Sequence, residues 1–576
     1  MTVALRAAAG NGRPRKLAVG GVDLHDASLA RSTNGAAFTY GRAVDAPDLL
    51  DPTPTRRVDG RKAGETLTFA FAQGVAGDTW HEMFAAAALP KTRFSVDAFA
   101  RDLFVADLVA GCRTTVIDGV RTQLPAKWLE RVLSRPPEDV AVVEFRRAIL
   151  GELAEHGEQR KALEDLHGRL RELLDQLQMV PARNTDVLRR RLDILATVKA
   201  CLEFMAASFP GVRSGLARIP AFASEVMASD GYRALLELLD YDDHLATVDV
   251  RVRVGSDGRV RGLALAKVEE NTRSRFARTP LGRWVARLVL LFRGFRFDAE
   301  ELIARAVEQV FEGLEQTVLA LMQLSYDLAF YLAALSFRAN AQKAGLDVCL
   351  PSIVDEGGTR IEGLWNPLLL AHEKHIVPSD VAMDPPFLTL LTGPNSGGKT
   401  RLLQSIGLCQ LLGQCGFFVP ARSATLRRTH GIFASFGQPP AADASEGRLG
   451  TELLRVRALF ETLPVGGLVL VDELCSGTNP SEGEDLFRLV LTLLSELEPQ
   501  GYLSTHFLTL ASDLERSPPY ERLSFLQVEL DERGVPTYRF QPGVAKTSLA
   551  HKTAARLGVT RDDLSALVQR AKAARR

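Results

Sequence analysis

Hydrophobic positions recur at helical spacing in the first half of the chain, from about residue 96 onward. Between residues 161 and 180, leucines follow one another at alternating steps of three and four, namely Leu163, Leu166, Leu170, Leu173 and Leu177. This spacing places the five side chains on one face of a helix, and a narrow leucine face is typical of a helix that packs against another helix. The pattern therefore predicts a mainly helical domain at 96–346.

The helical pattern is interrupted at about 247–268. Four valines alternate there with polar or charged residues, and the turn sequence Gly-Ser-Asp-Gly follows at 255–258; the valines are Val248, Val250, Val252 and Val254. Alternation with a period of two that runs into a turn predicts a β-hairpin. We expect a small hairpin inserted into the helical domain, with helices resuming near residue 278 and running to about 344.

The segment 317–337 is long enough and apolar enough to resemble a membrane span, with Asp327 as its only charged residue. It continues an amphipathic pattern that begins near Glu300, and no cap or helix breaker separates the two parts. One long helix that enters a protein core accounts for both. We therefore predict a buried helix and no membrane-spanning segment.

The remaining stretches differ from this helical region. After Leu350, short apolar runs alternate with helical ones, which predicts a parallel α/β sheet at 347–545. Residues 1–95 are rich in Gly, Ala, Pro and Arg, and turn sequences such as Asp59-Gly60 predict an amino-terminal extension of short strands and loops. Residues 546–576 have the pattern of two short helices.

Composition narrows the class of protein. At 576 residues with 46% hydrophobic residues, the chain is long enough for roughly three or four globular domains. Its six cysteines form no Cys-x-x-Cys pair, and the start of the chain lacks the apolar stretch of a secretory signal. We expect reduced thiols and a cytoplasmic protein. The histidines of Ala-His-Glu-Lys-His at 371–375 are one residue short of the zinc pattern His-Glu-x-x-His, so no zinc site is predicted.

The formal net charge is zero, which excludes a uniformly basic surface. Charge is nevertheless segregated, because residues 251–296 hold eleven Arg and one Lys against three acidic residues, a local charge of +9. DNA phosphates are the partner that we favour for this segment. Two alternatives are a solvated face neutralised by the acidic stretch from Glu300 and a helix lying on an anionic membrane. For the apolar residues at 284–292, ordinary core packing is the preferred interpretation.

A glycine-rich loop follows an apolar run at 387–392 and precedes an amphipathic helix. Its residues fit the pattern Gly-x-x-x-x-Gly-Lys-Thr and comprise Gly393, Pro394, Asn395, Ser396, Gly397, Gly398, Lys399 and Thr400. A loop with few side chains lets backbone N–H groups approach phosphate oxygens, and the helix dipole adds positive potential there. We expect Lys399 to contact the outer phosphates of ATP and Thr400 to ligate Mg²⁺.

Two further strands end in polar residues. The apolar run at 468–471 is followed by Asp472 and Glu473, and Gly-Tyr-Leu-Ser-Thr-His-Phe at 501–507 places His506 at the end of a third strand. At the carboxyl edge of a parallel sheet these side chains lie beside the phosphate loop. We expect Asp472 to hold magnesium directly or through water, and Glu473 to orient or deprotonate the attacking water. His506 is expected to hydrogen-bond the γ-phosphate or that water.

These motifs resemble those of the MutS family of DNA mismatch-repair ATPases. Their order and approximate spacing match Thr-Gly-Pro-Asn-Ser-Gly-Gly-Lys-Thr at 392–400, Leu-Val-Leu-Val-Asp-Glu from 468, Ser-Thr-His-Phe at 504–507 and the closing segment 538–559. The segment 363–370 resembles the family's entry into the ATPase domain, with Asn366 where a His is usual, and 325–341 resembles its returning lever helix. The similarity spans roughly 96–570 and is strong after 350.

The resemblance implies an α/β P-loop ATPase domain of the ABC type, joined to a mainly α-helical lever domain that carries the hairpin, with 546–576 as a helical dimerisation segment. It implies a homodimer with composite ATP and Mg²⁺ sites, whose levers close on duplex, mismatched or branched DNA in mismatch repair or recombination control. By matching position, Gly393–Thr400 bind ATP, Asp472 and Glu473 serve magnesium and hydrolysis, and His506 acts as the switch.

Three departures limit this expectation. Where the family offers Ser or Thr followed by Phe, this chain has Gly447 and Arg448, so the Arg448 guanidinium or the Gly447 N–H is expected to meet the partner's γ-phosphate. No Phe-x-Glu element occurs in residues 1–95, and no Smr nuclease module follows the closing helices, so mismatch reading and nicking are not expected. The alternatives are an ABC ATPase of the SMC or transporter type, although no LSGGQ-like segment precedes 468, and an ATP-gated structural clamp with no repair role.

Overall fold

The computed structural model describes residues 46–75, 78–117, 119–180, 185–243, 246–254, 260–270, 299–373, 375–383, 387–437, 448–475, 479–518, 523–546 and 558–573. Side chains are described for all of these except 185–186, 240–243, 246–254, 260–270, 299–303, 305, 387, 448–449 and 573. The described residues all belong to one compact unit of the chain, Ala43–Arg576.

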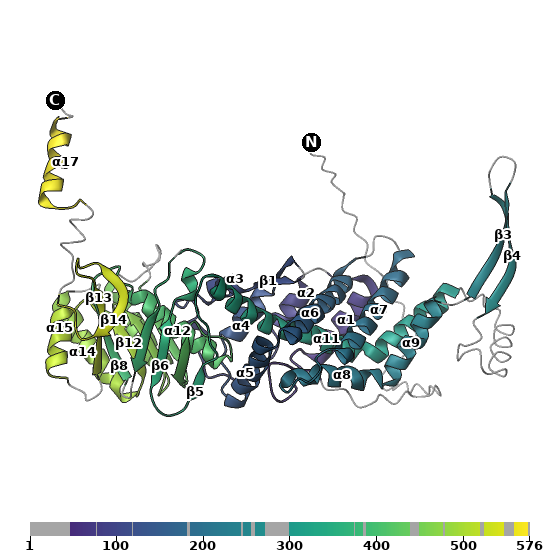
Figure 1. Cartoon of the computed structure of the whole chain (residues 1–576), viewed down its shortest axis with the longest axis horizontal. Helices are drawn as coiled ribbons and strands as arrows, with labels where there is room; N and C mark the ends of the chain where they lie inside the picture. The colour runs from purple at the N-terminus through teal and green to yellow at the C-terminus, as the bar shows by residue number, and fades with distance from the viewer. Residues whose placement is uncertain are drawn as a thin grey trace, which may run out of the picture. The chain divides into compact units, whose positions relative to one another are not determined.

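The first half of the described chain is helical (Figure 1). Its helices are α1 Gly60–Gln73, α2 Thr79–Ala85, α3 Val105–Cys112, α4 Ala126–Leu133, α5 Val140–Glu155, α6 Gly157–Gln178, α7 Thr185–Ala207, α8 Arg218–Met227, α9 Asp230–Asp243 and α11 Ala299–Lys343, with the 3₁₀ turns η1 Val96–Ala98 and η2 Gly215–Ala217. Two hairpins accompany them, β1 Thr114–Ile117 with β2 Val120–Gln123 and β3 Ala246–Val254 with β4 Val260–Glu270.

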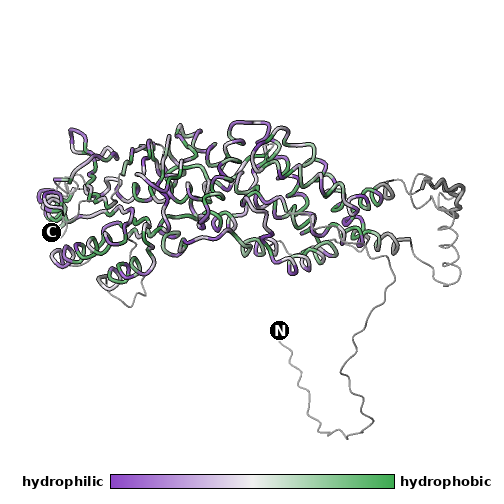
Figure 2. The backbone as a smooth tube through the Cα atoms, turned by 90° about the horizontal axis from the view of Figure 1, so that it is seen from below, coloured by the Kyte–Doolittle hydropathy of each residue, from purple (hydrophilic) through white to green (hydrophobic). Residues whose placement is uncertain are grey.

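The leucine face predicted at 161–180 lies on α6 and is buried. All five leucines, from Leu163 to Leu177, are at most 2% exposed, and α6 contacts α5, α7 and α11. Figure 2 shows hydrophobic and hydrophilic residues alternating along the helices, as expected for helices that bury one face. The predicted helix–helix packing of this segment is confirmed.

Helix α11 includes the apolar segment that resembles a membrane span. In the described part of the chain it is the one helix long and apolar enough to cross a membrane, and its most apolar stretch is wholly buried within the protein. Side chains on all sides of it, including Phe330 and Tyr331, are 0% exposed. The prediction of one long helix inside a core is confirmed.

The described part of the amino-terminal region contradicts the expectation of short strands and loops. Residues 60–73 and 79–85 are the helices α1 and α2, and α1 contacts α6, α7 and α11. The sequence Asp59-Gly60 is not a turn between strands, because the Asp59 carboxylate caps α1 by accepting hydrogen bonds from the N–H groups of Arg61 and Lys62. Leu67 and Phe71, one helical turn apart, are buried on its inner face. Residues 46–95 thus pack with the helical domain.

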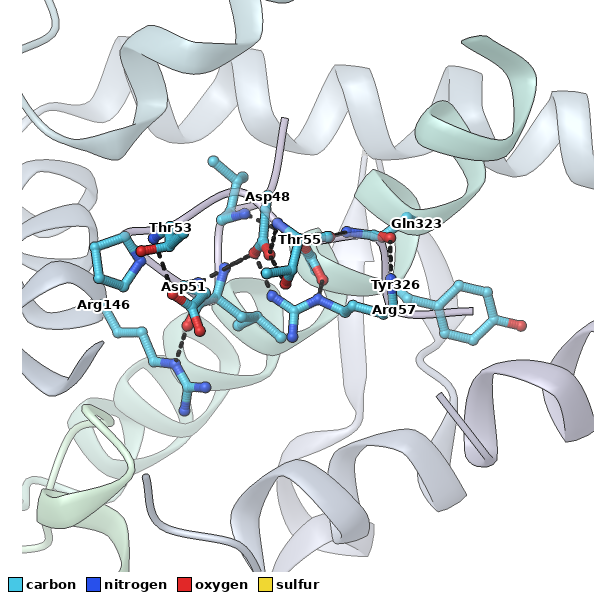
Figure 3. Close-up of polar contacts among 12 residues, drawn as sticks. Asp48, Asp51, Thr53, Thr55, Arg57, Arg146, Gln323 and Tyr326 are labelled. Carbon is cyan, nitrogen blue, oxygen red and sulfur yellow. Dashed lines mark hydrogen bonds and ion pairs between the residues drawn. The ribbon is translucent and has the colours of Figure 1, made fainter. Parts of the chain in front are cut away.

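A cluster of buried charges links the segment before α1 to α11. Asp48, Arg57 and Asp327 form this core charge cluster, of which Figure 3 labels Asp48 and Arg57. Arg57 pairs with Asp48 and lies 3.6 Å (Nε to Oδ1) from Asp327, and all three side chains are at most 1% exposed. Asp327 also accepts a hydrogen bond from the N–H of Leu49 at 3.1 Å. The single charge in the apolar stretch 317–337 is therefore paired.

Arg146 of α5 extends this polar region toward the second half of the chain. Its Nε donates to the carbonyl of Leu50 at 2.9 Å, and its Nη1 donates to the carbonyl of Cys415 at 3.1 Å. Cys415 is the residue at the carboxyl end of α12 (Lys399–Gln414). One fully buried guanidinium thus bridges the segment before α1 and the end of α12. Figure 3 shows Arg146 beside the segment before α1.

The second half of the chain contains two β-sheets. The six-stranded sheet has the order β10-β11-β12-β8-β13-β14, in which the first five strands are parallel and β14 is antiparallel. Its strands are β8 Phe387–Thr392, β10 Ile432–Phe436, β11 Leu468–Asp472, β12 Gln500–Ser504, β13 Leu523–Leu530 and β14 Pro536–Pro542. The four-stranded sheet has the order β5-β9-β6-β7 and consists of β5 Ser352–Val354, β6 Thr359–Leu364, β7 Ser379–Met383 and β9 Ser423–Arg427.

Helices cover both faces of the six-stranded sheet. On one face α12 contacts β10, β11 and β12, and it also contacts β6 of the smaller sheet (Figure 1). The other face packs on α13 Arg448–Thr462, α14 Pro480–Glu496 and α15 Leu508–Arg516. The alternation of β11 fits this arrangement, because Leu468 and Leu470 join the core on the α12 side while Val469 and Val471 join the core of α14 and α15. Burial on both faces explains the continuous apolar run.

Two predicted regions are described only in part. Strands β3 and β4 form an antiparallel pair where alternating valines predict a hairpin. The side chains of the basic segment 251–296 lie outside the described residues. At the carboxyl end the structure contains α17 Arg561–Ala573, and 547–557 lie outside the described residues.

Candidate nucleotide-binding site

The order of the parallel strands gathers the sequence motifs at one edge of the sheet. Strand β12 lies between β11 and β8, and all three run in the same direction. The carboxyl ends of β8, β11 and β12 lead into the glycine-rich loop, into Asp472 and Glu473, and into Thr505 and His506. Ligands of parallel α/β sheets bind outside this edge. Segments more than 100 residues apart in the sequence therefore form a single site.

The loop between β8 and α12 packs closely against β13. Gly393 has φ of +141°, and a Cβ built there would lie 2.6 Å from Cγ2 of Val528. A Cβ at Gly397 would lie 2.9 Å from the carbonyl of Pro394 and from the same Val528 side chain. Gly398 caps α12 with φ of +93°. Glycine is thus required by space at two positions and by backbone conformation at the start of the helix.

Lys399 is the first residue of α12 and its side chain lies inside the loop. Nζ donates to the carbonyls of Gly393 at 3.1 Å and Pro394 at 3.3 Å, and the residue is 5% exposed. Burial lowers the pKa of the Lys399 ammonium, against the opposing effect of Glu473 and Asp472. The cation is held where loop oxygens surround it, and phosphate oxygens can take the place of those carbonyls.

Asp472 is held by two hydroxyl groups. Thr400 Oγ1 donates to its Oδ2 at 2.5 Å, and Ser504 Oγ donates to its Oδ1. Asp472 is 8% exposed and Ser504 is 0% exposed. The structure thus brings together the two residues predicted to hold magnesium. A hydroxyl and a carboxylate oxygen at hydrogen-bond distance are a donor pair suited to Mg²⁺.

The Glu473 carboxylate lies against His506. The Nε2 of His506 lies 2.5 Å from Oε1 of Glu473, and the Nζ of Lys399 lies 3.9 Å from the same oxygen. The hydrogen bond from His506 lowers the pKa of the Glu473 carboxyl, and burial opposes this shift. The backbone of Glu473 has φ of +52°, a conformation that costs a non-glycine residue of order 1–3 kcal/mol. Lys399, Asp472, Glu473 and His506 form the loop charge cluster.

Other predicted positions are placed less completely. Asn395 and Ser396 are exposed at the tip of the loop, and Ser396 has φ of +62°. Arg448 is the first residue of α13, but its side chain and Gly447 lie outside the described residues, so its contact with a partner nucleotide stays a prediction. Asn366 is buried and donates to the carbonyl of Arg401 on α12 at 3.1 Å.

Ser504 was not among the site residues predicted from the sequence. Its hydroxyl lies between the two acids, donating to Asp472 and accepting a hydrogen bond from the N–H of Glu473 at 3.0 Å. The one sequence feature that points to Ser504 is its position two residues before His506, at the end of a predicted strand. Serine is common at such positions, and only the strand order identifies the side chains that its hydroxyl meets.

Part of the chain is similar to known proteins. Residues 389–574 match the family MutS domain V. Similar proteins include the Endonuclease MutS2 of Thermomicrobium roseum, 31% identical over 271 residues, which are 46% of this chain and 34% of that protein. The Endonuclease MutS2 of Alkaliphilus metalliredigens is 34% identical over 225 residues, 38% of this chain and 27% of the relative. That of Shouchella clausii is 32% identical over 270 residues, 46% of this chain and 32% of the relative.

The fold and the site define a class of protein with two parts. A helical domain comes first in the chain, and a mixed α/β domain with a glycine-rich loop at its sheet edge follows it. Part of the chain is similar to the MutS family, through its match to MutS domain V and its likeness to Endonuclease MutS2 proteins. It spans about a third of the length of the relatives that it matches.

Proposed function

We propose that this protein binds and hydrolyses ATP with Mg²⁺ and uses the cycle to close on duplex, mismatched or branched DNA, in mismatch repair or recombination control. The observation that carries the proposal is the meeting of Lys399, Thr400 and Asp472 at the glycine-rich loop. The match of residues 389–574 to MutS domain V supports it. The α/β domain is then a P-loop ATPase domain, and the helical domain is its lever.

The loop fits a triphosphate. Gly393, Gly397 and Gly398 place no side chain between their own backbone and a ligand, and α12 starts at Lys399 with its positive dipole end toward the loop. Lys399 already lies inside the loop, bonded to two carbonyl groups. Exchange of those carbonyls for phosphate oxygens places its charge on the outer phosphates.

The residues beside the loop fit magnesium. Thr400 and Asp472 supply a hydroxyl and a carboxylate oxygen that are 2.5 Å apart. Bound Mg²⁺ neutralises charge on the β- and γ-phosphate oxygens during phosphoryl transfer. To hold it, Thr400 must turn its hydroxyl proton away from Asp472, which frees Oδ2 of the carboxylate.

Glu473 and His506 supply the groups for hydrolysis. The low pKa of Glu473 keeps its carboxylate ionised, so it is able to accept a proton from, or orient, a water molecule. In the structure that carboxylate bonds His506. Turnover therefore requires Glu473 to exchange this bond for one to water, while His506 becomes free to donate to the γ-phosphate or to the water.

Replacement of Glu473 by glutamine tests the proposed hydrolysis. We expect Glu473→Gln to lower the ATP turnover number roughly 10²- to 10⁴-fold, because an amide cannot accept the proton. Nucleotide binding, measured by fluorescence of a labelled ATP analogue, should persist. Glu496→Gln, at an exposed position on α14, is the matched control and should turn over like the wild type.

Two outcomes would contradict this assignment. Equal and negligible turnover in wild type and Glu473→Gln would favour a structural clamp that uses ATP only to hold a dimer together. Failure of the wild type to bind Mg²⁺-ATP would remove the ATPase proposal as a whole.

DNA binding, homodimerisation and a cytoplasmic location are the wider parts of the proposal. The basic segment 251–296, with its charge of +9, supports DNA as the partner. Affinity for homoduplex, mismatch and four-way junction DNA should fall steeply as salt increases, and a slope near zero against log salt would exclude a phosphate clamp. Arg448→Ala should weaken ATP-driven dimerisation in sedimentation measurements, and an unchanged dimer with unchanged turnover would remove Arg448 from the site.

A further inference from the structure

Ser504 lies at the centre of the proposed nucleotide site, although the sequence motif that contains it, Ser-Thr-His-Phe at 504–507, assigned a role only to His506. It is the last residue of β12, the strand between β11, which ends in Asp472, and β8, which leads into the glycine-rich loop. Its side chain is 0% exposed. The buried hydroxyl at the end of β12 therefore lies beside the ends of β11 and β8, where the predicted functional residues are.

The hydroxyl of Ser504 makes two bonds with distinct roles. It donates its proton to Oδ1 of Asp472, and it accepts a hydrogen bond from the backbone N–H of Glu473 at 3.0 Å. A hydroxyl has one proton to donate, so this arrangement uses the donor on the carboxylate and an acceptor lone pair on the amide. One side chain therefore contacts both acids, each through a different part of the residue.

The bond from the N–H of Glu473 to Ser504 helps to hold the backbone of Glu473 in a strained conformation. The backbone of Glu473 is in the left-handed region with φ of +52°, and its N–H is fixed by Ser504. That conformation turns the Glu473 side chain toward His506, while Asp472 faces Thr400. Strained backbone of this kind persists only where surrounding contacts hold it.

The two oxygens of Asp472 are also distinguished from one another. Oδ2 bonds the Thr400 hydroxyl, which is free to turn, whereas Oδ1 bonds Ser504, which the sheet encloses. If the Thr400 hydroxyl turned to a metal ion, Oδ2 of Asp472 would become available while Oδ1 stayed bonded to Ser504. Asp472 would then present its free oxygen to the metal in an orientation that Ser504 already fixes.

We infer that Ser504 is a positioning residue for the ATPase reaction: its hydroxyl orients Asp472 for Mg²⁺ and fixes the backbone of Glu473 so that its carboxylate faces the water site. This inference rests on the proposed function, since it assigns work to a site that must first bind Mg²⁺-ATP. Ser504 acts through Asp472 and Glu473, both of which its hydroxyl contacts.

The test measures ATP turnover against Mg²⁺ concentration for Ser504→Ala and Ser504→Thr. Loss of a hydrogen bond to a charged group corresponds to roughly a tenfold effect, so Ser504→Ala should lower kcat about tenfold. It should also raise the Mg²⁺ concentration at half-maximal turnover by about the same factor and leave KM for ATP near the wild-type value. Ser504→Thr keeps the hydroxyl and should restore both values to within about twofold.

Thr389→Val is the matched control. Thr389 is a buried hydroxyl residue on β8 of the same sheet, bonded to Ser524 at 2.8 Å and to neither acid. Its replacement removes a buried hydroxyl from the sheet, so a general loss of packing would appear there as well. The Mg²⁺ dependence of Thr389→Val should match the wild type.

The outcomes separate this inference from the proposed function. A wild type without Mg²⁺-dependent turnover overturns both. An active wild type with unchanged kcat and Mg²⁺ dependence in Ser504→Ala overturns the inference alone. If Ser504→Ala does not fold, Ser504→Cys, with a weak donor of similar size, should show the same displacement in Mg²⁺ dependence, and its absence overturns the inference.

Discussion

Two charge clusters in the described chain differ in their surroundings. In the core charge cluster, Asp48, Arg57 and Asp327 are at most 1% exposed. In the loop charge cluster, the side chain of Glu473 is 36% exposed and that of His506 is 32% exposed. The first cluster is enclosed by α11 and the segment before α1, whereas the second opens at the edge of the parallel sheet.

The partners of the two clusters differ as well. Asp48 accepts hydrogen bonds from the N–H groups of Leu50, at 2.8 Å, and Asp51, at 3.1 Å, in addition to its bond with Arg57. These partners are parts of the fold, and the Asp48 side chain that they contact is buried. Lys399 instead bonds two carbonyls of its own loop, which a ligand can replace. Charges with buried, built-in partners hold a structure together, and charges with exchangeable partners form a site.

Removal of one charge from the core cluster should have the largest effect on stability. Arg57→Met leaves Asp48 and Asp327 buried without their cation, and breaking a buried ion pair in this way costs about 3–5 kcal/mol of unfolding free energy. Urea denaturation measures it. Arg61→Met is the control, because the Arg61–Glu65 pair is exposed and its loss should cost about 0.5 kcal/mol or less. Equal losses in both variants would contradict the distinction between the clusters.

A substitution in the loop should combine a smaller loss of stability with a loss of ligand binding. In Gly393→Ala the new methyl group meets Val528 at 2.6 Å, and overpacking of this kind costs about 1–3 kcal/mol. Affinity for labelled Mg²⁺-ATP should fall because the loop must move. Gly119→Ala measures the cost of placing alanine at a positive φ without steric overlap, since Gly119 has φ of +80° and nothing within 4 Å of the added Cβ.

The comparison of these two glycines gives a clear criterion. Gly393→Ala should be the less stable variant in urea denaturation, and Val528→Ala should partly restore both its stability and its nucleotide affinity. If Gly119→Ala is equally destabilised, or if Val528→Ala restores nothing, the overlap with Val528 is not the reason that glycine is needed.

An unpaired buried group should give the smallest effect, and one that depends on pH. His167 on α6 is 5% exposed, its Nδ1 has no hydrogen-bond partner, and burial lowers its pKa from 6.5 to about 4, with a smaller effect of Arg171. The folded protein holds this ring neutral, so its contribution to stability is complete above pH 6.5 and is lost as the pH falls toward 4.

From pH 7.5 to 5.5 the wild type should lose about 1.4 kcal/mol more unfolding free energy than His167→Gln, which has no titrating group there. Urea denaturation at the two pH values measures the difference. His156→Gln, at an exposed position, should lose as much as the wild type. Identical losses in wild type and His167→Gln would contradict a neutral buried ring.

The amino-acid sequence by itself determined the features that depend on short spacing. The leucine face of α6 follows from helical periodicity, and the loop Gly393–Thr400 and the pair Asp472 and Glu473 follow from chemistry that needs those residues in that order. The long helix α11 could also be predicted, since an unbroken apolar pattern admits one interpretation. Residues close in the sequence stay close in the fold, so patterns of short spacing can be interpreted without knowledge of the tertiary structure.

Only the tertiary structure decided which distant groups meet. The sequence shows Asp327 as an isolated charge, and its partner Arg57 is found 270 residues earlier only through the path of the chain. Ser504 gained its role because the strand order places β12 between β11 and β8. Asp59 caps a helix because the apolar face of α1 is buried against other helices, and that burial stabilises the helix that Asp59 begins. The physical cause is that local propensity is weak, and burial of apolar surface between distant segments determines which local conformation is kept.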